Sequence, residues 1–318
     1  MKENYKLSVV VPVYKEENNI LPFVKRVKEV TNDLGCDYEI IFSLDPSPDR
    51  TEAVIQELHE KDRRIKLLRM SRRFGQPACT MAGIHYATGD ACVVIDVDLQ
   101  DPPELIRTMV QKWKEGYHVA YAQRVSRKGE TLIKRLVSYA GYKLINKIAE
   151  VEIPRNTGDF RLMSRQVVRQ LKKLKEHDNF LRGLVAYVGF KQIGIPYNRD
   201  ERHSGKGNYN RLFGSIRIGA NGFFGFSKYP LHLISILGVT ISSFSFFLGL
   251  TYLILKLMNV NILWGNPTLV ILISFLSGIQ LLSLGVFGEY FARIYDGIQC
   301  RPIFIVEDGL GFGDDGEK

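Results

Sequence analysis

Two long stretches near the C-terminus contain no charged residue, and they constrain the fold of this chain more than any other feature. They cover residues 231–255 and 268–288, and neither contains Asp, Glu, Lys or Arg. Each is long enough to cross a hydrocarbon layer of about 30 Å, which takes roughly 20 apolar residues in a helix. Helices buried in a soluble core are the alternative, but core helices seldom stay uncharged over such lengths. The pattern predicts a two-helix transmembrane hairpin at residues 230–290, with helices at about 231–257 and 268–288.

Basic residues flank this hairpin at its outer ends. Lys228 precedes the first stretch, Arg293 and Arg301 follow the second, and the connecting segment 258–267 contains neither Lys nor Arg. Since positively charged flanks stay in the cytoplasm, both ends of the hairpin are predicted to face the cytosol. The rest of the chain then divides into a cytosolic domain (1–207), an interfacial amphipathic segment (208–229) and a cytosolic C-terminal tail (291–318). The Gly- and Asp-rich residues after Asp308 are expected to be flexible.

The N-terminal domain alternates short apolar runs with longer helix-like stretches. Runs rich in Val, Ile and Leu predict strands, and the stretches between them predict helices. This alternation predicts an α/β fold with a mostly parallel sheet covered by helices on both faces, in which ligands bind at the carboxyl ends of the strands. The predicted strands are 7–12, 39–44, 65–70, 91–96 and 118–122, and the predicted helices are 20–33, 51–61, 76–87 and 104–115.

Polar side chains follow each predicted strand. In strand order they are Tyr14 and Glu16, Asp45, Arg72 and Arg73, Asp96 and Asp98, and Arg124. For any single residue, a solvated strand end explains the polarity as well as a site does. Asp96 and Asp98 are more specific, because they follow the apolar run 93–95 and would point to the same side of an extended segment. Paired carboxylates suit Mg²⁺ or Mn²⁺, whose remaining positions phosphate and water fill.

The net charge narrows the choice of partners. The chain carries a formal charge of +9, and its basic residues concentrate in 124–147 and 199–217. The second region leads into the first predicted membrane helix, which favours anionic lipid or a lipid phosphate over nucleic acid. Residues 131–149 have an amphipathic basic pattern that fits either a helix docked on the sheet or a helix lying on the membrane.

Several motifs together resemble those of family 2 glycosyltransferases. They are Val10-Val11-Pro12-Val13-Tyr14-Lys15-Glu16-Glu17-Asn18, Gly75-Gln76, Ala82-Gly83-Ile84, Gly89-Asp90 and Asp96-Val97-Asp98-Leu99-Gln100-Asp101-Pro102-Pro103-Glu104. Within that family, the chain resembles the polyprenyl-phosphate (dolichyl-phosphate-like) sugar transferases, specifically the bacterial two-helix glucosyltransferase type associated with O-antigen glucosylation. The resemblance covers nearly the whole chain. It implies a GT-A type, Rossmann-like cytosolic domain and a multi-pass protein of the bacterial inner membrane.

The resemblance also implies roles for particular residues. Donor binding would fall to Pro12, Tyr14, Glu16, Asp45, Asp96, Val97, Asp98, Gln100, Arg124 and Arg202. The metal would be held by Asp96, Asp98 and Gln100, and the acceptor phosphate by Arg124 and Arg135. Asp98 and Asp159 would be the catalytic residues.

The chemistry of these residue types agrees with the implied roles. A guanidinium grips phosphate oxygens in a bidentate fork, although a solvated helix face explains Arg135 equally well. A phosphate monoester acceptor is largely ionised at neutral pH, so Asp159 is expected mainly to orient it and to remove any residual proton. Two positions depart from the family pattern. Leu44-Asp45-Pro46-Ser47 lacks one expected acidic contact to the nucleotide, and Gly205-Lys206-Gly207-Asn208-Tyr209 displaces an expected lysine.

These features predict an inverting, metal-dependent transferase that moves a hexose, with glucose from UDP-glucose favoured, to polyprenyl phosphate at the cytosolic membrane face. GDP-mannose and UDP-N-acetylhexosamine are alternative donors, and a non-catalytic membrane scaffold that binds sugar nucleotide is an alternative of another class. A processive polysaccharide synthase is disfavoured because it needs more membrane helices and a Gln-x-x-Arg-Trp motif. A nicotinamide oxidoreductase is disfavoured because no Gly-x-Gly-x-x-Gly follows the first predicted strand. Small residues such as Gly238 and Gly249 would suit a homo-oligomer.

Overall fold

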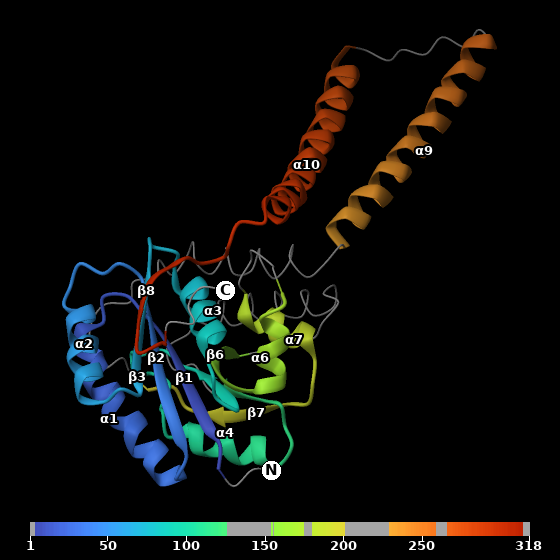
Figure 1. Ribbon diagram of the computed structural model, residues 1–318. Coiled ribbons are helices and arrows are strands. Elements are labelled where there is room, and N and C mark those ends of the chain that lie inside the picture. Colours follow the sequence, from blue (N-terminus) through green and yellow to red (C-terminus); the bar gives the residue numbers. More distant parts are fainter. Residues whose placement is uncertain are drawn as a thin grey trace.

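The computed structural model describes residues 4–125, 154, 156–174, 180–200, 229–258 and 266–313. An α/β domain carries two long helices that extend from one of its ends (Figure 1). Arg135, Arg202, the amphipathic pattern 131–149 and the interfacial segment up to residue 228 lie outside the described residues.

The described part of the chain contains one mixed sheet of eight strands. These are β1 (Lys6–Val13), β2 (Asp37–Leu44), β3 (Ile65–Met70), β4 (Ala91–Val94), β5 (Val119–Arg124), β6 (Thr157–Ser164), β7 (Gln192–Tyr197) and β8 (Val306–Leu310). They are ordered β7-β5-β6-β4-β1-β2-β3-β8. Neighbours from β4 to β3 pair in parallel, as do β5 and β7, whereas β6 is antiparallel to both β4 and β5. The start of β6 therefore lies at the same edge as the carboxyl ends of β4 and β5.

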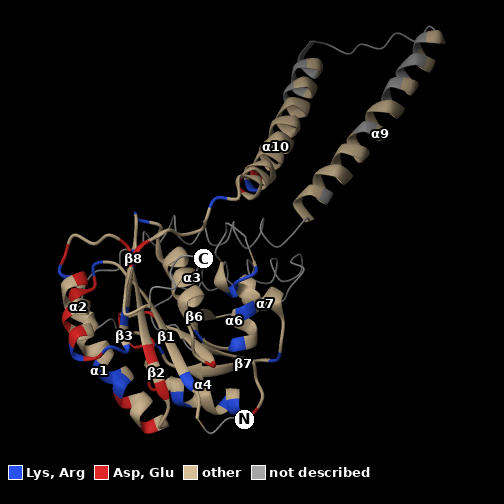
Figure 2. Cartoon of the chain, viewed as in Figure 1, with Lys and Arg blue, Asp and Glu red and all other residues tan. Residues whose placement is uncertain are grey.

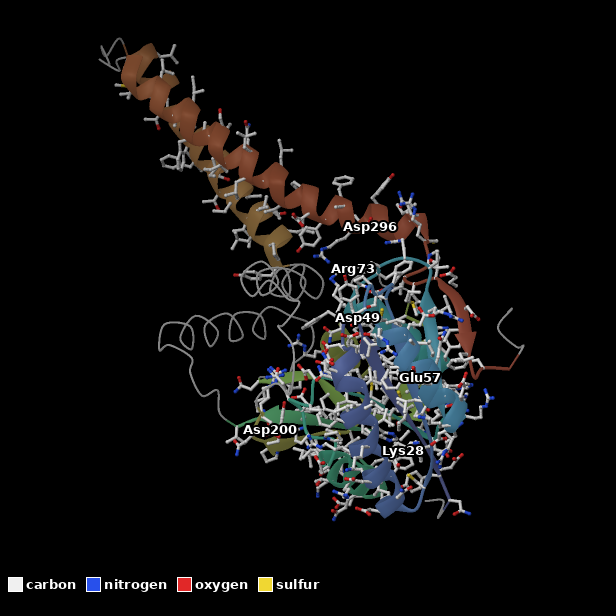
Figure 3. All side chains as sticks on the ribbon, turned by 90° about the vertical axis from the view of Figure 1, so that its left-hand side faces the viewer. Lys28, Asp49, Glu57, Arg73, Asp200 and Asp296 are labelled. Atoms are coloured by element: carbon white, nitrogen blue, oxygen red, sulfur yellow. The ribbon has the colours of Figure 1, made fainter. Side chains whose placement is uncertain are left out.

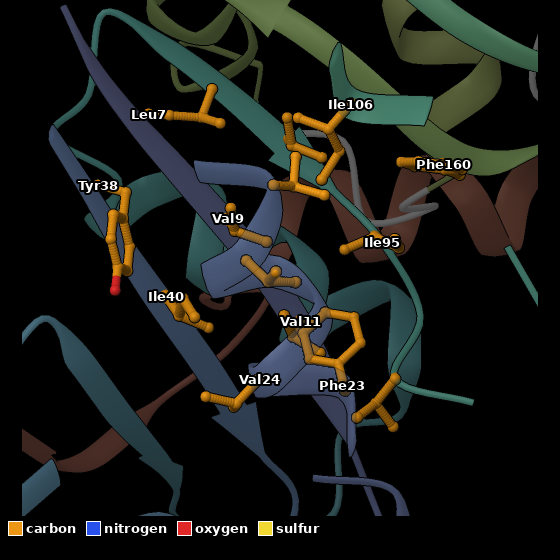
Figure 4. Close-up of a cluster of buried hydrophobic side chains, with 14 of the residues drawn as sticks. Leu7, Val9, Val11, Phe23, Val24, Tyr38, Ile40, Ile95, Ile106 and Phe160 are labelled. Atoms are coloured by element: carbon orange, nitrogen blue, oxygen red, sulfur yellow. The ribbon is translucent and has the colours of Figure 1, made fainter. Parts of the chain in front are cut away.

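Helices cover both faces of this sheet, as the alternation predicted. One face carries α1 (Glu17–Leu34), α2 (Thr51–Lys61) and α4 (Leu105–Lys114), and the other carries α3 (Gln76–Tyr86), α6 (Arg165–Leu171) and α7 (Leu181–Val188). Because side chains alternate along a strand, Val9 and Val11 pack with Phe23 of α1 (Figure 4), whereas Val10 packs on the α3 side. Gly83 lets α3 approach β1 closely, since a Cβ there would clash with Val10.

The α/β prediction is confirmed, with the five predicted strands and four predicted helices all present. Strand β4 ends at Val94, two positions before the predicted end at Asp96. Strands β6 to β8 and the helices α6 and α7 were not predicted. In these segments the pairing partners are distant in sequence, and their apolar runs are short.

Two long apolar helices follow the domain, α9 (Tyr229–Leu257) and α10 (Asn266–Gln299). By length and composition, Tyr229–Phe247 and Phe275–Gln299 are long and apolar enough to cross a membrane. Large apolar side chains on both are exposed, among them Phe246 at 68% and Leu281 at 70%, unlike those of a soluble core helix. The described residues of both helices are almost uncharged except at the domain-proximal end of α10 (Figure 2).

Helix α10 continues past residue 288, where the predicted membrane helix ends, and the tail then returns to the domain. Strand β8 pairs antiparallel with β3, with Leu310 opposite Leu67 and Gly309 opposite Leu68. The expectation of a flexible tail after Asp308 is therefore wrong for Gly309 and Leu310. The ladder to β3 and the packing of Phe312 on Tyr86, with ring centroids 5.3 Å apart, hold this segment.

Candidate active site

The carboxyl ends of the parallel strands face the end of the domain from which α9 and α10 extend. The N-terminus lies at the opposite end of the domain (Figure 1), and Arg73, which follows β3, lies at the hairpin end (Figure 3). Ligands of open α/β sheets bind at such an edge. The sheet thus presents its ligand-binding edge toward the membrane-type helices.

An acidic turn follows β4 at this edge. Residues 97 and 98 form a turn, and Leu99 has a positive φ of 60°, so the segment is not extended here as expected. Asp98 is 8% exposed and accepts a hydrogen bond from the backbone N–H of Gln100 at 3.2 Å. Val97 is buried in the core.

The Asp96 carboxyl lies among other acidic groups. Gln76 at the start of α3 donates to its Oδ1 at 2.8 Å. Burial, followed by the charges of Asp101, Asp98 and Asp159, raises the pKa of Asp96 to about 8. The crowding of four carboxylates at one point is electrostatically costly, and a bound cation would relieve it. Within the described residues, no three His, Cys, Asp or Glu side chains are placed to hold a metal ion by themselves.

A chain of polar contacts joins this turn to β5 and β7. Arg124 at the end of β5 donates from Nε to the hydroxyl of Tyr197 at 3.2 Å. Tyr197 in turn donates to the buried Asp101, whose Oδ1 also lies 3.5 Å from Nε of Arg199. Burial and Asp101 raise the pKa of Tyr197 to about 12, so it remains a proton donor at neutral pH. The network holds Arg124 at the edge of the acidic turn.

Asp159 joins the same edge from β6. Val94 pairs with Arg161 in the antiparallel register, and extending that register by two residues brings Asp159 beside Asp96. The preceding Gly158 makes room for Arg124, because a Cβ there would lie 2.9 Å from Nη2 of that arginine. The structure therefore brings together Asp96, Asp98, Arg124 and Asp159, which are far apart in the sequence.

The first two strands end in residues that organise the loops around them. Asp45 is 2% exposed, and its carboxylate accepts from the backbone N–H groups of Phe74 at 3.0 Å and Gly75 at 2.8 Å. It therefore shapes the loop after β3, and its predicted contact with the nucleotide stays a prediction. Tyr14 stacks against Arg73, with the guanidinium carbon 4.2 Å from the ring centroid.

The remaining predicted donor residues are also tied into this edge. Pro12 is buried on β1, opposite Ser43 of β2. The backbone N–H of Glu16 donates to Thr51 at 2.9 Å. The amide of Gln100 donates to the carbonyl oxygen of Asp200 at 3.4 Å, which links the acidic turn to the segment after β7.

Comparison with known proteins assigns the family. Residues 8–172 match the family model "Glycosyl transferase family 2". The chain belongs to glycosyl transferase family 2. It is 44% identical to the uncharacterized glycosyltransferase YkcC of Bacillus subtilis (strain 168), covering 98% of this chain and 96% of that one. It is 38% identical to a protein of Shigella flexneri named SfII prophage-derived bactoprenol glucosyl transferase, covering 95% and 97%.

The family assignment makes this chain a glycosyltransferase, and its α/β domain has the GT-A type of fold. A solved mannosyltransferase of Pyrobaculum calidifontis, in complex with GDP-Man and Mn²⁺, is similar over 75% of this chain and 65% of its own, with 18% identity and a TM-score of 0.45.

Sequence reasoning missed several residues of this candidate site. Tyr197 and Arg199 were not singled out, because β7 has no strong strand signal and its pairing with β5 is non-local. Asp101 stands inside the motif that carried the family resemblance, but nothing in its spacing marked it as a buried partner of Tyr197. Arg182, which lies 3.4 Å from Asp159, had no sequence signal.

Proposed function

We propose that this glycosyltransferase moves a hexose, with glucose from UDP-glucose favoured, to polyprenyl phosphate at the cytosolic face of the bacterial inner membrane. The observation that carries the proposal is the acidic turn at Asp96 and Asp98, which lies at the sheet edge facing two helices long enough to span a membrane. The relatives named bactoprenol glucosyl transferase, similar over nearly their whole length, favour glucose and a polyprenyl acceptor. GDP-mannose and UDP-N-acetylhexosamine remain the alternative donors.

The crowded carboxylates fit a divalent cation. Asp96 and Asp98, with Gln100 beside them, would hold Mg²⁺ or Mn²⁺ together with the diphosphate of the donor. Such an ion supplies charge stabilisation for the departing diphosphate. Arg124 lies at the edge of the same turn and would bind phosphate oxygens, either of the donor or of the acceptor.

In the proposed reaction an oxygen of the lipid phosphate attacks the anomeric carbon as the bond from that carbon to the diphosphate breaks. The new bond forms on the face opposite the leaving group, so the configuration inverts. Asp159 would orient the acceptor phosphate and take up its residual proton, if one is present. Fixed positive charge at this edge, such as that of Arg124, would stabilise the negative charge that develops on the departing diphosphate. The predicted self-association through α9 stays a prediction.

The assay incubates purified protein in lipid vesicles with polyprenyl phosphate and a panel of radiolabelled UDP- and GDP-sugars, and then extracts the lipid. Label in the lipid phase from UDP-glucose is expected for wild type and for Asp33→Asn, a matched control on the surface of α1. Asp98→Asn should abolish it. Absence of label with every donor would refute lipid glycosylation and leave the scaffold alternative, and transfer from GDP-mannose alone would refute the assignment of glucose.

A further inference from the structure

Two arginines converge on the short segment that carries Asp159. Arg161 follows it on β6, and Arg182 lies in the first turn of α7. Arg161 is 3% exposed, and its guanidinium donates to the carbonyl oxygens of Gly158 at 2.8 Å and of Asp159 at 3.3 Å. Arg161 therefore fixes the backbone of the segment, and the carboxylate of Asp159 is left for a different partner.

Arg182 contacts that carboxylate. Its Nε lies 3.4 Å from Oδ1 of Asp159, and its Nη1 donates to the carbonyl oxygen of Thr157 at 3.1 Å. The guanidinium also packs on the ring of Phe180, 4.9 Å from the centroid. The side chain of Arg182 is 15% exposed and that of Asp159 is 35% exposed. The arginine is therefore the more buried partner of this ion pair, and the carboxylate of Asp159 is partly open to solvent.

The ion pair between Arg182 and Asp159 matters because Asp159 has a second carboxylate, that of Asp96, as a neighbour. Extending the register of β4 and β6 brings Asp159 beside Asp96, and two carboxylates side by side repel each other. The positive charge of Arg182, 3.4 Å from the Asp159 carboxylate, offsets this repulsion through an ion pair and not through a hydrogen bond.

We propose that Arg182 is a positioning residue for the acceptor step, holding the Asp159 carboxylate in the orientation that receives the lipid phosphate. The proposal rests on the proposed function and adds to it a residue that acts through Asp159 without contacting the acceptor. Group orientation in an active site has large effects on rate, so its loss should be visible in the kinetics.

The experiment uses the full chain in vesicles that contain polyprenyl phosphate, and it compares Arg182→Met with Arg182→Lys and Asp159→Asn. Arg169→Met is the matched control, because Arg169 is exposed on the neighbouring α6. With Arg182→Met, kcat/KM for the lipid phosphate should fall about fivefold, as expected for the loss of a partly exposed ion pair. Arg182→Lys should recover part of this loss, and Arg169→Met should match wild type. The affinity for UDP with Mn²⁺ should stay unchanged, whereas the melting temperature should fall slightly, because the hydrogen bond to Thr157 and the packing on Phe180 are also lost.

Three results would overturn the proposal. A purely structural role predicts that Arg182→Met loses nucleotide affinity along with activity. An unchanged kcat/KM would show that the contact is irrelevant to turnover. A loss larger than that of Asp159→Asn would show that Arg182 does not act through Asp159. If the wild-type protein transfers no sugar to lipid phosphate, the proposed function fails, and the role of Arg182 fails with it. If the wild-type protein transfers sugar and Arg182→Met is equally active, only the role of Arg182 fails and the proposed function stands.

Discussion

The returning tail should contribute measurably to the stability of the α/β domain, and Phe312→Ala tests this. Phe312 is half-buried, packs on Tyr86 at 5.3 Å and lies under the ammonium of Lys66, 4.9 Å from the ring centroid. Removing a half-buried Phe side chain costs about 1 kcal/mol of transfer free energy, roughly half the value for full burial. The lost aromatic pair costs about 0.5–1.5 kcal/mol more. We expect the free energy of unfolding to fall by about 2 kcal/mol.

For a domain of this size, each kcal/mol lowers the melting temperature by about 2–4 °C, so the expected shift is about 4–8 °C. Differential scanning fluorimetry in detergent measures it through Trp113, which packs on Tyr5 in the domain core. Phe244→Ala is the matched control, because Phe244 is 64% exposed on α9. If Phe312→Ala melts with wild type, or if both variants melt equally early, the tail is not an integral part of the domain.

Two further predictions concern carboxyl groups whose pKa values the structure shifts. Burial raises the pKa of Glu39, but hydrogen bonds from Ser8 and Thr88, together with Lys66, outweigh it and hold the pKa at about 2 rather than 4.5. The stabilisation, up to about 3 kcal/mol, is present above pH 4.5 and is lost as the pH falls toward 2, so Glu39→Gln should flatten the acid dependence of melting between these values. Asp96→Asn should abolish sugar transfer. It should also raise the melting temperature of the metal-free protein, because it removes one of several carboxyl groups that repel each other. A lower melting temperature would contradict the inference that these carboxyl groups destabilise the metal-free protein.

The strands and helices that could be predicted are those that pair or pack with elements close to them in the sequence. The buried residues of α1 recur at helical spacing, Ile20, Phe23, Val24 and Val27, and the strands on either side contain the apolar runs Val9–Val13 and Ile40–Phe42. Successive β–α units then place their strands in parallel with short connections. The residues that follow these strands, including Asp96 and Asp98, could be assigned to one edge on this basis alone.

Strand β8 shows why the other elements could not be predicted from the sequence. Its sequence, Val-Glu-Asp-Gly-Leu, alternates poorly, and the Gly-rich residues around it are typical of a flexible tail. Its order comes from β3, which lies far earlier in the chain, and from the ion pairs that Arg69 makes with Glu52 and Asp308. No local pattern encodes such a partner, because β-propensity depends on the surface that a strand meets.

The direction of β6 decides whether Asp159 can belong to the site at all. Inserted between β4 and β5, a parallel β6 would carry Asp159 near its start to the edge opposite Asp96. The antiparallel register, with Val94 opposite Arg161, instead brings the start of β6 to the end of β4. The sequence motif identified Asp159 through resemblance, but the physical reason for its place is this one reversed strand. The same reversal places the segment of Asp159, which Arg161 and Arg182 contact, at this edge, so the proposed acceptor side of the site depends on a topological feature that periodicity does not reveal.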